Sequence, residues 1–366
     1  LVVENALDAR RYGCDLYLYR EVVELGPQGV RVKSEDGQVE LLTADLVINV
    51  TGPWVDQLLG RTGGNFPRQM GGTKGSHIIV DVFPGLPPEA LYVEASADGR
   101  PYFIVPWNDQ LLIGTTDLRS DEDLDSVRAR RDECQYLIDE TNKLYPQANL
   151  TLDKIHFTYS GIRPLPHTPA GKTAAITRRH QVVDHPEAGF PLLSVVGGKL
   201  TTYRSLAEEA VDKIYKKLRL PKKKCRTGQR PLPGFSLLHE PNFTQRFAER
   251  HGLSVPCARH LARTYGAWAE DIAELANQQP ELKETVCART EALAAEVVWS
   301  CRREEITHLE DFMLRRSLIA WQEGQGREAV DAVLRFMAPL KGWDEARAAQ
   351  EKERFLSRLE RFRVPD

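Results

Sequence analysis

Gly197-Gly198-Lys199-Leu200-Thr201-Thr202 is the stretch whose residue types and spacing point most directly to chemistry. It follows an apolar, strand-like run over residues 191–196 and precedes a helical pattern over residues 205–215. Paired glycines at such a junction let a ligand approach the backbone, because no Cβ intrudes. The first helical turn offers unpaired N–H groups and the positive end of the helix dipole, which together stabilise an anion. A tight turn with a threonine cap would explain the same residues in isolation.

Two other glycine segments carry polar side chains. Thr51-Gly52-Pro53-Trp54 follows the apolar run of residues 45–50, a position at which doubly wound folds bind nucleotides. Gly71-Gly72-Thr73-Lys74-Gly75-Ser76-His77 combines glycines with a cation and an imidazole. A structural turn is the simpler interpretation of the first segment, and a flexible surface turn that of the second.

Two arginines and a carboxylate follow further strand-like runs. Ile113-Gly114-Thr115-Thr116-Asp117 places hydroxyl groups and a carboxylate just beyond a strand, with a helix N-cap as the alternative. Arg163 lies between Gly161 and Pro164, where a rigid turn could aim it inward, and Arg178 ends a run that begins at residue 174. A solvent-exposed side chain is the simpler interpretation of Arg163.

The elements that must position these residues are strands in the first part of the chain. We expect strands at residues 16–19, 21–25, 29–33, 45–50, 77–80, 102–105, 111–114 and 191–196. Asp36-Gly37 predicts a hairpin turn. Helical patterns cover residues 1–12, 55–59, 122–145 and 205–215.

The character of the sequence changes near residue 220. Lys222-Lys223-Lys224 and Pro231-Leu-Pro-Gly234 indicate a linker over residues 221–240. The patterns after it are helical. We therefore expect an α/β (α+β) domain over residues 1–220, with a mixed or antiparallel sheet, and an all-α domain over residues 241–366.

Composition excludes several classes of function. The chain is 42% hydrophobic and 28% charged, with a formal net charge of -3, which argues against a nucleic-acid partner. None of the six cysteines forms a Cys-x-x-Cys pair, so neither zinc nor a redox dithiol is expected. Glu305-x-x-His308 has the spacing of half a metal site, but no second copy is present, and we expect no metal. The chain opens without Met inside a helical pattern, which suggests that residues precede it.

Six motifs occur in a characteristic order: Thr51-Gly-Pro-Trp, Lys74-Gly-Ser-His, Val105-Pro-Trp, Ile113-Gly-Thr-Thr-Asp, Tyr159-Ser-Gly-Ile-Arg-Pro-Leu and Val196-Gly-Gly-Lys-Leu-Thr-Thr-Tyr-Arg. In this order they resemble the FAD-dependent (aerobic) glycerol-3-phosphate dehydrogenases of the D-amino-acid-oxidase-like flavoprotein superfamily. The later part, with Asp311-Phe-Met-Leu-Arg-Arg316, is similar to the helical domain of that family. The resemblance spans essentially the whole chain and implies an FAD/NAD(P)-binding-type sheet.

The resemblance also implies a reaction. sn-Glycerol 3-phosphate would be oxidised at C2 to dihydroxyacetone phosphate, and electrons would pass through FAD to quinone. Arg163, Arg178 and Lys199 would hold the phosphate. Lys74 would hold or polarise the substrate hydroxyls, and His77 would assist proton removal, which makes Lys74, His77 and Arg163 the candidate catalytic residues. The base itself is left open.

The resemblance implies cofactor contacts as well. Gly198, Lys199, Leu200, Thr201 and Thr202 would face the pyrimidine edge of the flavin. Thr51 and Gly52 would lie along the nucleotide half of FAD, and the backbone of Val22 would meet adenine. The family's quinone acceptor implies a cytoplasmic protein peripheral to the inner face of the cytoplasmic membrane. A homodimer is left open.

One departure from the family pattern has consequences. The Gly-x-Gly-x-x-Gly loop that binds the FAD pyrophosphate is missing from the early part of the chain, so the binding sheet is expected to be incomplete. The similar string at residues 324–329 lies between helical patterns and indicates a helix–helix turn. We expect this chain alone to bind FAD poorly or not at all and to be inactive. Three rivals are an oxidase that uses oxygen, an amine-oxidising relative and a non-catalytic docking module in residues 235–366.

Overall fold

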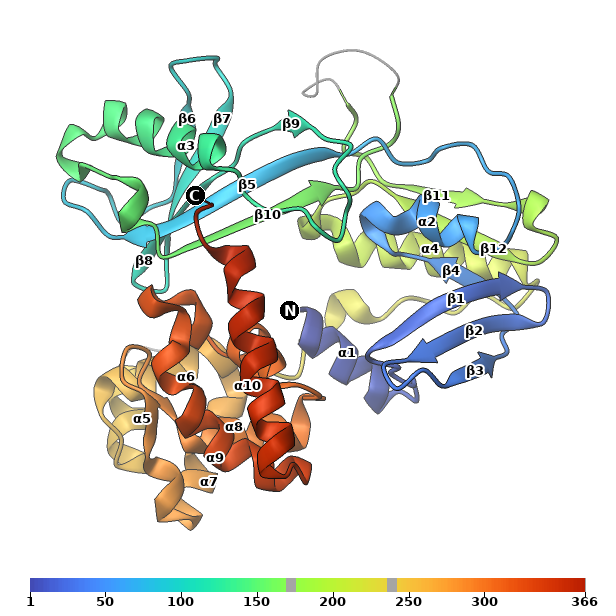
Figure 1. Cartoon of the computed structure of the whole chain (residues 1–366). Helices are drawn as coiled ribbons and strands as arrows, with labels where there is room; N and C mark the ends of the chain where they lie inside the picture. Colours follow the sequence, from blue (N-terminus) through green and yellow to red (C-terminus); the bar gives the residue numbers. More distant parts are fainter. Residues whose placement is uncertain (169–175, 236–241, 366) are drawn as a thin grey trace.

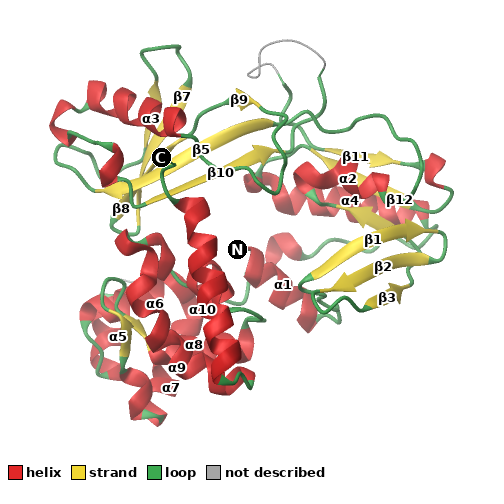
Figure 2. Ribbon diagram, in the orientation of Figure 1, coloured by secondary structure: helices red, strands yellow, loops and turns green. Residues whose placement is uncertain are grey.

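The computed structural model describes residues 1–168, 176–235 and 242–365. Strands and flanking helices make up the part of the chain before the linker, and the part after it folds into a cluster of helices (Figures 1 and 2). The N-terminus lies between these two parts, and the chain ends beside the large sheet (Figure 1). The predicted division into a mixed α/β part and a helical part agrees with this arrangement.

A small sheet with helices on both faces carries the two predicted glycine junctions. Its strand order is β11 (Gln181–Asp184), β12 (Leu192–Val196), β4 (Val47–Asn49). Alternate β12 residues point to opposite faces, so Leu192 packs with α2 (Val55–Gly60) and Leu193 with α4 (Tyr203–Lys217). Both faces of β12 are therefore buried, as its nearly continuous apolar sequence predicts.

A larger antiparallel sheet has the strand order β10-β5-β8-β7-β6, with β9 also paired to β5. Its strands are β5 (Thr73–Asp81), β6 (Leu91–Glu94), β7 (Pro101–Trp107), β8 (Gln110–Gly114), β9 (Leu118–Arg119) and β10 (Phe157–Arg163). One face packs on α3 (Arg131–Leu144), with Ile78 and Leu137 in that core. Ile79 points to the other face and joins the core of the C-terminal helices.

Helix α1 (Val2–Arg11) precedes a three-stranded meander of β1 (Arg20–Gly26), β2 (Gly29–Ser34) and β3 (Val39–Leu42). The hairpin turn at Gly37, with φ 87°, is confirmed. The prediction of a strand at residues 16–19 is wrong, because these residues form a turn that ends at Tyr19 in the left-handed region. Tyr17 and Leu18 are exposed, whereas the Tyr19 ring packs edge-on against His308 of the C-terminal part.

The helix predicted over residues 122–145 begins only at Arg131. Carboxylates in its first turn, Asp132 and Glu133, suit the positive end of a helix and help to explain this start. Residues before it follow an irregular path in which Glu122 pairs with Lys74 and Val127 is buried. A tertiary ion pair has overridden the local helical pattern.

The C-terminal part contains α5 (Phe243–His251), α6 (Val255–Tyr265), α7 (Ala269–Gln278), α8 (Ala294–Arg303), α9 (Val330–Lys341) and α10 (Glu345–Leu359). The expectation of helices alone missed a small ribbon of β13 (Thr285–Cys287) and β14 (Ala292–Leu293). Gly324 and Gly326 are left-handed within a short helical turn before α9, and the described residues between β14 and this turn include helical segments but no strand. The string at residues 324–329 is thus a turn between helical segments, as predicted.

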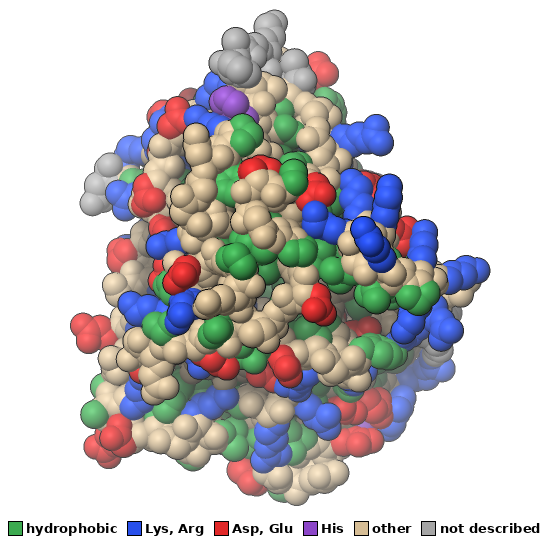
Figure 3. Space-filling model, turned by 90° about the vertical axis from the view of Figure 1, so that its right-hand side faces the viewer, with side chains coloured by type: hydrophobic (Ala, Val, Ile, Leu, Met, Phe, Trp, Pro, Cys, Tyr) green, Lys and Arg blue, Asp and Glu red, His purple; other side chains and the backbone are tan. Residues whose placement is uncertain are grey.

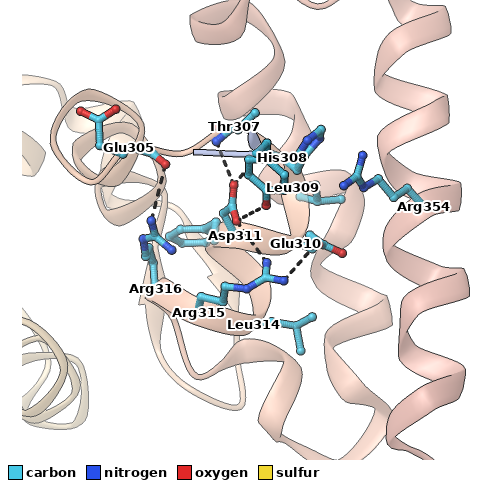
Figure 4. Close-up of polar contacts among 12 residues, drawn as sticks. Glu305, Thr307, His308, Leu309, Glu310, Asp311, Leu314, Arg315, Arg316 and Arg354 are labelled. Atoms are coloured by element: carbon cyan, nitrogen blue, oxygen red, sulfur yellow. Dashed lines mark hydrogen bonds and ion pairs between the residues drawn. The ribbon is translucent and has the colours of Figure 1, made fainter. Parts of the chain in front are cut away.

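The segment Asp311–Arg316 is held by polar contacts that centre on Asp311 and Arg315 (Figure 4). The Asp311 carboxylate accepts hydrogen bonds from the backbone N–H groups of Thr307 and His308, both at 2.9 Å, and from Arg315. It also accepts the Tyr19 hydroxyl at 2.6 Å. Burial raises the pKa of Tyr19, and the bond to Asp311 acts in the same direction. This motif therefore has a structural role.

Both side chains of the half-site Glu305-x-x-His308 contact protein groups. Glu305 pairs with Arg10, and the His308 ring lies between Glu351, at 2.9 Å, and Glu35, at 2.7 Å. Among the described residues, no group of three or more His, Cys, Asp or Glu side chains is arranged to hold a metal ion. The same part of the chain contains no helix with the length and apolar character needed to cross a bilayer.

Candidate active site

Two strand–glycine–helix junctions lie side by side at one edge of the small sheet. β4 and β12 are parallel neighbours in the register Val47↔Leu192 and Asn49↔Ser194, so their carboxyl ends meet at the same edge. The chain continues from there through Gly52 into α2 and through Gly197 into α4. Ligands of open α/β sheets bind outside the carboxyl ends of strands. The predicted cofactor contacts at Thr51 and Gly52 and at residues 198–202 are therefore brought together by strand pairing.

The first junction is fixed by a buried asparagine. The Asn49 side-chain oxygen accepts hydrogen bonds from the backbone N–H of Thr51, at 3.2 Å, and from its hydroxyl, at 2.7 Å. The Asn49 amide group donates to the Val55 carbonyl at 3.1 Å. Gly52 adopts a left-handed φ of 61°, and a Cβ on it would meet only open space. The turn thus presents backbone to a free surface.

The second junction requires glycine. Gly197 and Gly198 have φ values of 78° and 103°, and a Cβ on Gly197 would lie 2.8 Å from the Arg179 carbonyl oxygen. The helix opens with a short turn over Leu200–Thr202 before α4 begins at Tyr203. These opening residues are exposed. The Thr202 N–H already donates to the Lys199 carbonyl at 3.0 Å, which leaves the N–H groups of Leu200 and Thr201 in this first turn for an anion.

The end of β10 contacts this glycine turn directly. The backbone N–H of Gly197 donates a 2.8 Å hydrogen bond to the carbonyl of Pro164, the residue after Arg163. The glycine-rich segment before β5 lies beside the same loop, because the Gly71 N–H donates to the Leu165 carbonyl at 3.0 Å. Four segments that are distant in the sequence thus converge at this edge.

The Arg163 guanidinium is partly buried and held on several sides. Its Nη1 group donates to Thr73, at 3.2 Å, and to Asp117, at 3.0 Å. Its Nη2 group donates to Thr115, at 3.1 Å, and to the Thr116 carbonyl, at 2.9 Å. Burial lowers the pKa of Arg163 from its usual value, while the charge of Asp117 opposes this shift. The geometry supplies a rigid cation.

Arg178 and Lys199 bring exposed positive charge to the same region. Arg178 is exposed in a loop rather than at a strand end, which corrects the prediction for residues 176–178; residues 174 and 175 lie outside the described part. Its charge contributes to the lowered pKa of Arg163, so the two cations are near one another. Lys199 is also exposed. Neither side chain forms a hydrogen bond or ion pair within the described residues, which leaves both available to an anionic ligand.

His77 lies on the same face of the large sheet as Arg163. Its ring stacks on Tyr159 with the centroids 4.6 Å apart, and its Nδ1 atom is buried without a hydrogen-bond partner among the described residues. Burial lowers the pKa of His77 to about 4, and the charge of Arg163 acts in the same direction. The imidazole is therefore neutral near pH 7, as a proton acceptor must be, but it is a weak base.

Lys74 is not with these residues, and its prediction as a catalytic group does not fit the structure. It lies three positions from His77 on β5, so its side chain points to the opposite face of the sheet. The side chain is 1% exposed, and its ammonium lies 2.9 Å from Glu133 and 3.2 Å from Glu122. Burial alone would raise the pKa of Glu133, but hydrogen bonds from Lys74, Ser76 and Thr116 outweigh it and lower the pKa. Lys74 thus neutralises a buried carboxylate.

Val22 lies on β1, the edge strand of the meander, beside an irregularity in its pairing with β2. The Leu25 N–H donates to the Arg61 carbonyl at 3.1 Å, which holds this strand next to the end of α2. Its predicted contact with adenine stays a prediction. The sequence did not single out Thr73, and it marked Asp117 as a carboxylate beyond a strand with a helix N-cap as the alternative. The structure shows β9 after Asp117 and both side chains on Arg163.

Comparison with known families decides the class of protein. Residues 1–204 match the family model described as FAD dependent oxidoreductase, and residues 225–348 match the C-terminal domain of alpha-glycerophosphate oxidase. The chain belongs to the FAD-dependent oxidoreductases. The mixed sheet and the helical C-terminal part of this oxidoreductase agree with that family.

Named relatives of this FAD-dependent oxidoreductase share one description. A glycerol-3-phosphate dehydrogenase of Synechocystis sp. is 43% identical over 335 residues, which cover 88% of this chain and 60% of the relative. The aerobic glycerol-3-phosphate dehydrogenase of Bacillus subtilis is 29% identical, with 94% of this chain and 64% of the relative covered. The chain thus spans less than two thirds of the length of these relatives.

A solved structure shows the same fold. The glycerol-3-phosphate dehydrogenase from Bacillus halodurans, complexed with FAD, superposes with a TM-score of 0.84 at 25% identity. The alignment covers 98% of this chain and 72% of that protein. FAD is thus the cofactor both of the family and of this structural neighbour.

Proposed function

We propose that this chain supplies the substrate-binding part of an FAD-dependent dehydrogenase that oxidises sn-glycerol 3-phosphate to dihydroxyacetone phosphate. The observation that carries the proposal is the convergence of Arg163 and Arg178 with the exposed first turn of α4. A phosphate ester is a dianion, and guanidinium groups with helix N–H donors are the groups that proteins use to bind it. The names of the relatives support the same substrate.

The residues at the sheet edge fit a dinucleotide cofactor. Gly52 presents open backbone, Gly197 and Gly198 make a turn without side chains, and the α4 start offers N–H donors. When bound, FAD accepts the hydride from C2 of the substrate. The residues Gly198–Thr202 would hold its ring edge, and Thr51 and Gly52 its nucleotide half.

The chain's own residues have separate tasks in this reaction. Arg178 and Lys199, which are free of protein partners in the described part, would bind and orient the phosphate. Arg163 would place a fixed positive charge beside the phosphate ester, because its own contacts fix the guanidinium plane. His77 is neutral at pH 7 and presents a ring nitrogen without a partner, so it is the candidate to receive the C2 hydroxyl proton, directly or through water.

A direct test is anaerobic mixing of sn-glycerol 3-phosphate with the FAD-loaded dehydrogenase that contains this chain, called the FAD-loaded protein below, followed by flavin absorbance. We expect bleaching with the phosphate ester and none with glycerol, which lacks the charge that Arg163 and Arg178 would bind. Bleaching by an amine substrate instead would favour the amine-oxidising alternative and refute the proposal.

Quinone is the electron acceptor that we propose, and oxygen is the second candidate. Oxygen is supported by the match of residues 225–348 to a domain named for alpha-glycerophosphate oxidase. Hydrogen peroxide released per substrate oxidised distinguishes the two. A quinone-linked enzyme should reduce a soluble quinone analogue and release little peroxide, and stoichiometric peroxide would overturn this part of the proposal.

We further propose that the printed 366-residue chain, when purified alone, retains little FAD and has no dehydrogenase activity. The reason is that no glycine-rich loop for the pyrophosphate follows a strand among its described residues; the similar string at residues 324–329 is a turn between helical segments. Equilibrium dialysis against FAD should give far less than one bound flavin per chain. One flavin per chain, with an ordinary flavoprotein spectrum, would contradict this prediction.

A cytoplasmic protein peripheral to the inner membrane face is the location that we propose. Exposed lysines at the end of α4 and in the linker support it, and Figure 3 shows a group of Lys and Arg side chains on this side of the molecule. Lys217 and Lys222 have carboxylate partners, whereas Lys216, Lys223 and Lys224 have none in the described part. Each free cation near an anionic bilayer adds about 1 kcal/mol.

Flotation with lipid vesicles tests this location. We expect the protein to float with phosphatidylserine vesicles at low salt and to be released by salt, and a variant with glutamine at positions 216, 223 and 224 to bind less. Equal binding of wild type and variant would remove the support from this cluster.

A further inference from the structure

Asp117 makes a contact to Arg163 that the proposed reaction does not yet use. It follows β8 and Thr115-Thr116, and its Oδ1 atom lies 3.0 Å from Nη1 of Arg163. Both side chains are about four-fifths buried, with 22% and 23% exposed. An ion pair at this depth is only partly screened by solvent, so its geometry is held more firmly than that of a surface pair.

The contacts of Arg163 account for nearly all of its hydrogen-bonding capacity. A guanidinium has five N–H donors, four of them on the two terminal nitrogens. Here the terminal nitrogens donate to four acceptors: Thr73, Asp117, Thr115 and the Thr116 carbonyl. Asp117 is the charged member of this set, so it determines the orientation of the guanidinium more strongly than the neutral acceptors do.

The backbone of Asp117 is held independently of its side chain. Arg100 donates a 2.7 Å hydrogen bond to the Asp117 carbonyl, and the next residue, Leu118, pairs with Lys74 in the sheet. A change confined to the Asp117 carboxylate therefore leaves the main chain held by both the Arg100 hydrogen bond and the pairing of Leu118. This separates an effect on Arg163 from general disruption of the loop.

The structure assigns Asp117 as the positioning residue for Arg163 in substrate binding. This rests on the proposed function, because the assignment concerns how Arg163 meets a phosphate ester. Asp117 acts through Arg163 and not on the substrate: it locks the guanidinium while Arg178 and Lys199 provide the uncompensated positive charge. A carboxylate beside an anion site weakens the Coulombic attraction of the phosphate to that site. The position of Asp117 is therefore explained by its orienting effect on the Arg163 guanidinium and not by its charge.

For Asp117→Asn in the FAD-loaded protein, a positioning role and a purely electrostatic role predict opposite changes in KM. If only charge mattered, removal of a negative group would lower KM for sn-glycerol 3-phosphate. Positioning predicts that KM rises about tenfold, the equivalent of one lost charge-assisted hydrogen bond, while the melting temperature changes little. Asp121→Asn is the matched control, because it removes the same charge from an 89% exposed side chain nearby and should leave KM unchanged. A KM that falls or stays constant in Asp117→Asn overturns the assignment.

A second readout does not depend on turnover. With ¹⁵N-labelled arginine, the Arg163 Nη protons of the wild type should exchange slowly with solvent, and Asp117→Asn should bring their exchange to the rate of exposed arginines. Unchanged slow exchange in the variant would overturn the assignment. If the wild type does not oxidise sn-glycerol 3-phosphate, the proposed function fails, whereas this exchange measurement still decides whether Asp117 positions Arg163.

Discussion

Replacing Lys74 with methionine should lower the free energy of unfolding by about 3–5 kcal/mol, the usual cost of leaving a buried charge without its partner. Lys74 is 1% exposed and Glu133 is 2% exposed, so water cannot solvate the carboxylate that remains. Urea unfolding followed by circular dichroism measures the loss. Lys216→Met, which removes an exposed lysine without a partner in the described part, should change stability by less than about 0.5 kcal/mol.

The pH dependence of this loss has a defined sign. In the wild type the pKa of Glu133 is lowered, so the pair contributes stability above the ordinary glutamate pKa of about 4.3 and loses it as pH falls. In Lys74→Met, burial acts without the cation, and protonation of Glu133 relieves the penalty at low pH. The difference in stability between wild type and variant should therefore shrink from pH 7 toward pH 4.

A double variant checks that the pair is the cause. Lys74→Met with Glu133→Gln removes both charges and should recover a large part of the stability that Lys74→Met loses. A double variant no more stable than Lys74→Met would show that Glu133 is not the group left unpaired.

Replacing Arg163 with alanine should reduce kcat/KM for sn-glycerol 3-phosphate by about 10²–10³-fold, because loss of one partner of a desolvated charge pair costs about 2–5 kcal/mol. The change removes a substrate cation and also leaves Asp117, at 3.0 Å from the lost group, facing the phosphate. Steady-state kinetics of the FAD-loaded protein measure it. The exposed Arg128, without a partner in the described part, is the matched control, and Arg128→Ala should retain normal kinetics.

A positive charge at position 163 should not be enough to restore kcat/KM. Arg163→Lys keeps a cation but cannot reach Thr73, Asp117 and Thr115 in one plane, because an ammonium is a point charge and a guanidinium is a fork. We expect the lysine variant to regain less than a tenth of the lost kcat/KM. Near-complete recovery would show that the held guanidinium geometry does not matter.

The strand–glycine–helix junctions were readable from sequence because each is a local pattern. Apolar runs before Thr51 and Gly197, with helical patterns after them, predicted β4, α2, β12 and α4. Their adjacency was not readable, since the register of β4 against β12 depends on strand pairing between segments far apart in the chain.

The prediction for Lys74 failed because glycines were interpreted as a loop. Residues 71–77 contain three glycines, yet β5 begins at Thr73. Gly75 lies within β5, where a Cβ would collide with the Arg163 guanidinium, and Gly72 lies just before β5, where a Cβ would collide with Ile162. Had residues 73–77 been taken as a strand, the odd spacing of Lys74 and His77 would have placed them on opposite faces.

The central claim, that Arg163, Arg178 and the tip of α4 form one site for a phosphate ester, is tested most directly by a crystal structure of the FAD-loaded protein with sn-glycerol 3-phosphate. We expect the phosphate to lie within hydrogen-bond distance of Arg178 or Lys199, with the ester beside Gly197–Thr202. Arg163 should still be bonded to Asp117. A phosphate bound at a different surface, with Arg163 and Arg178 both free of it, would contradict the account.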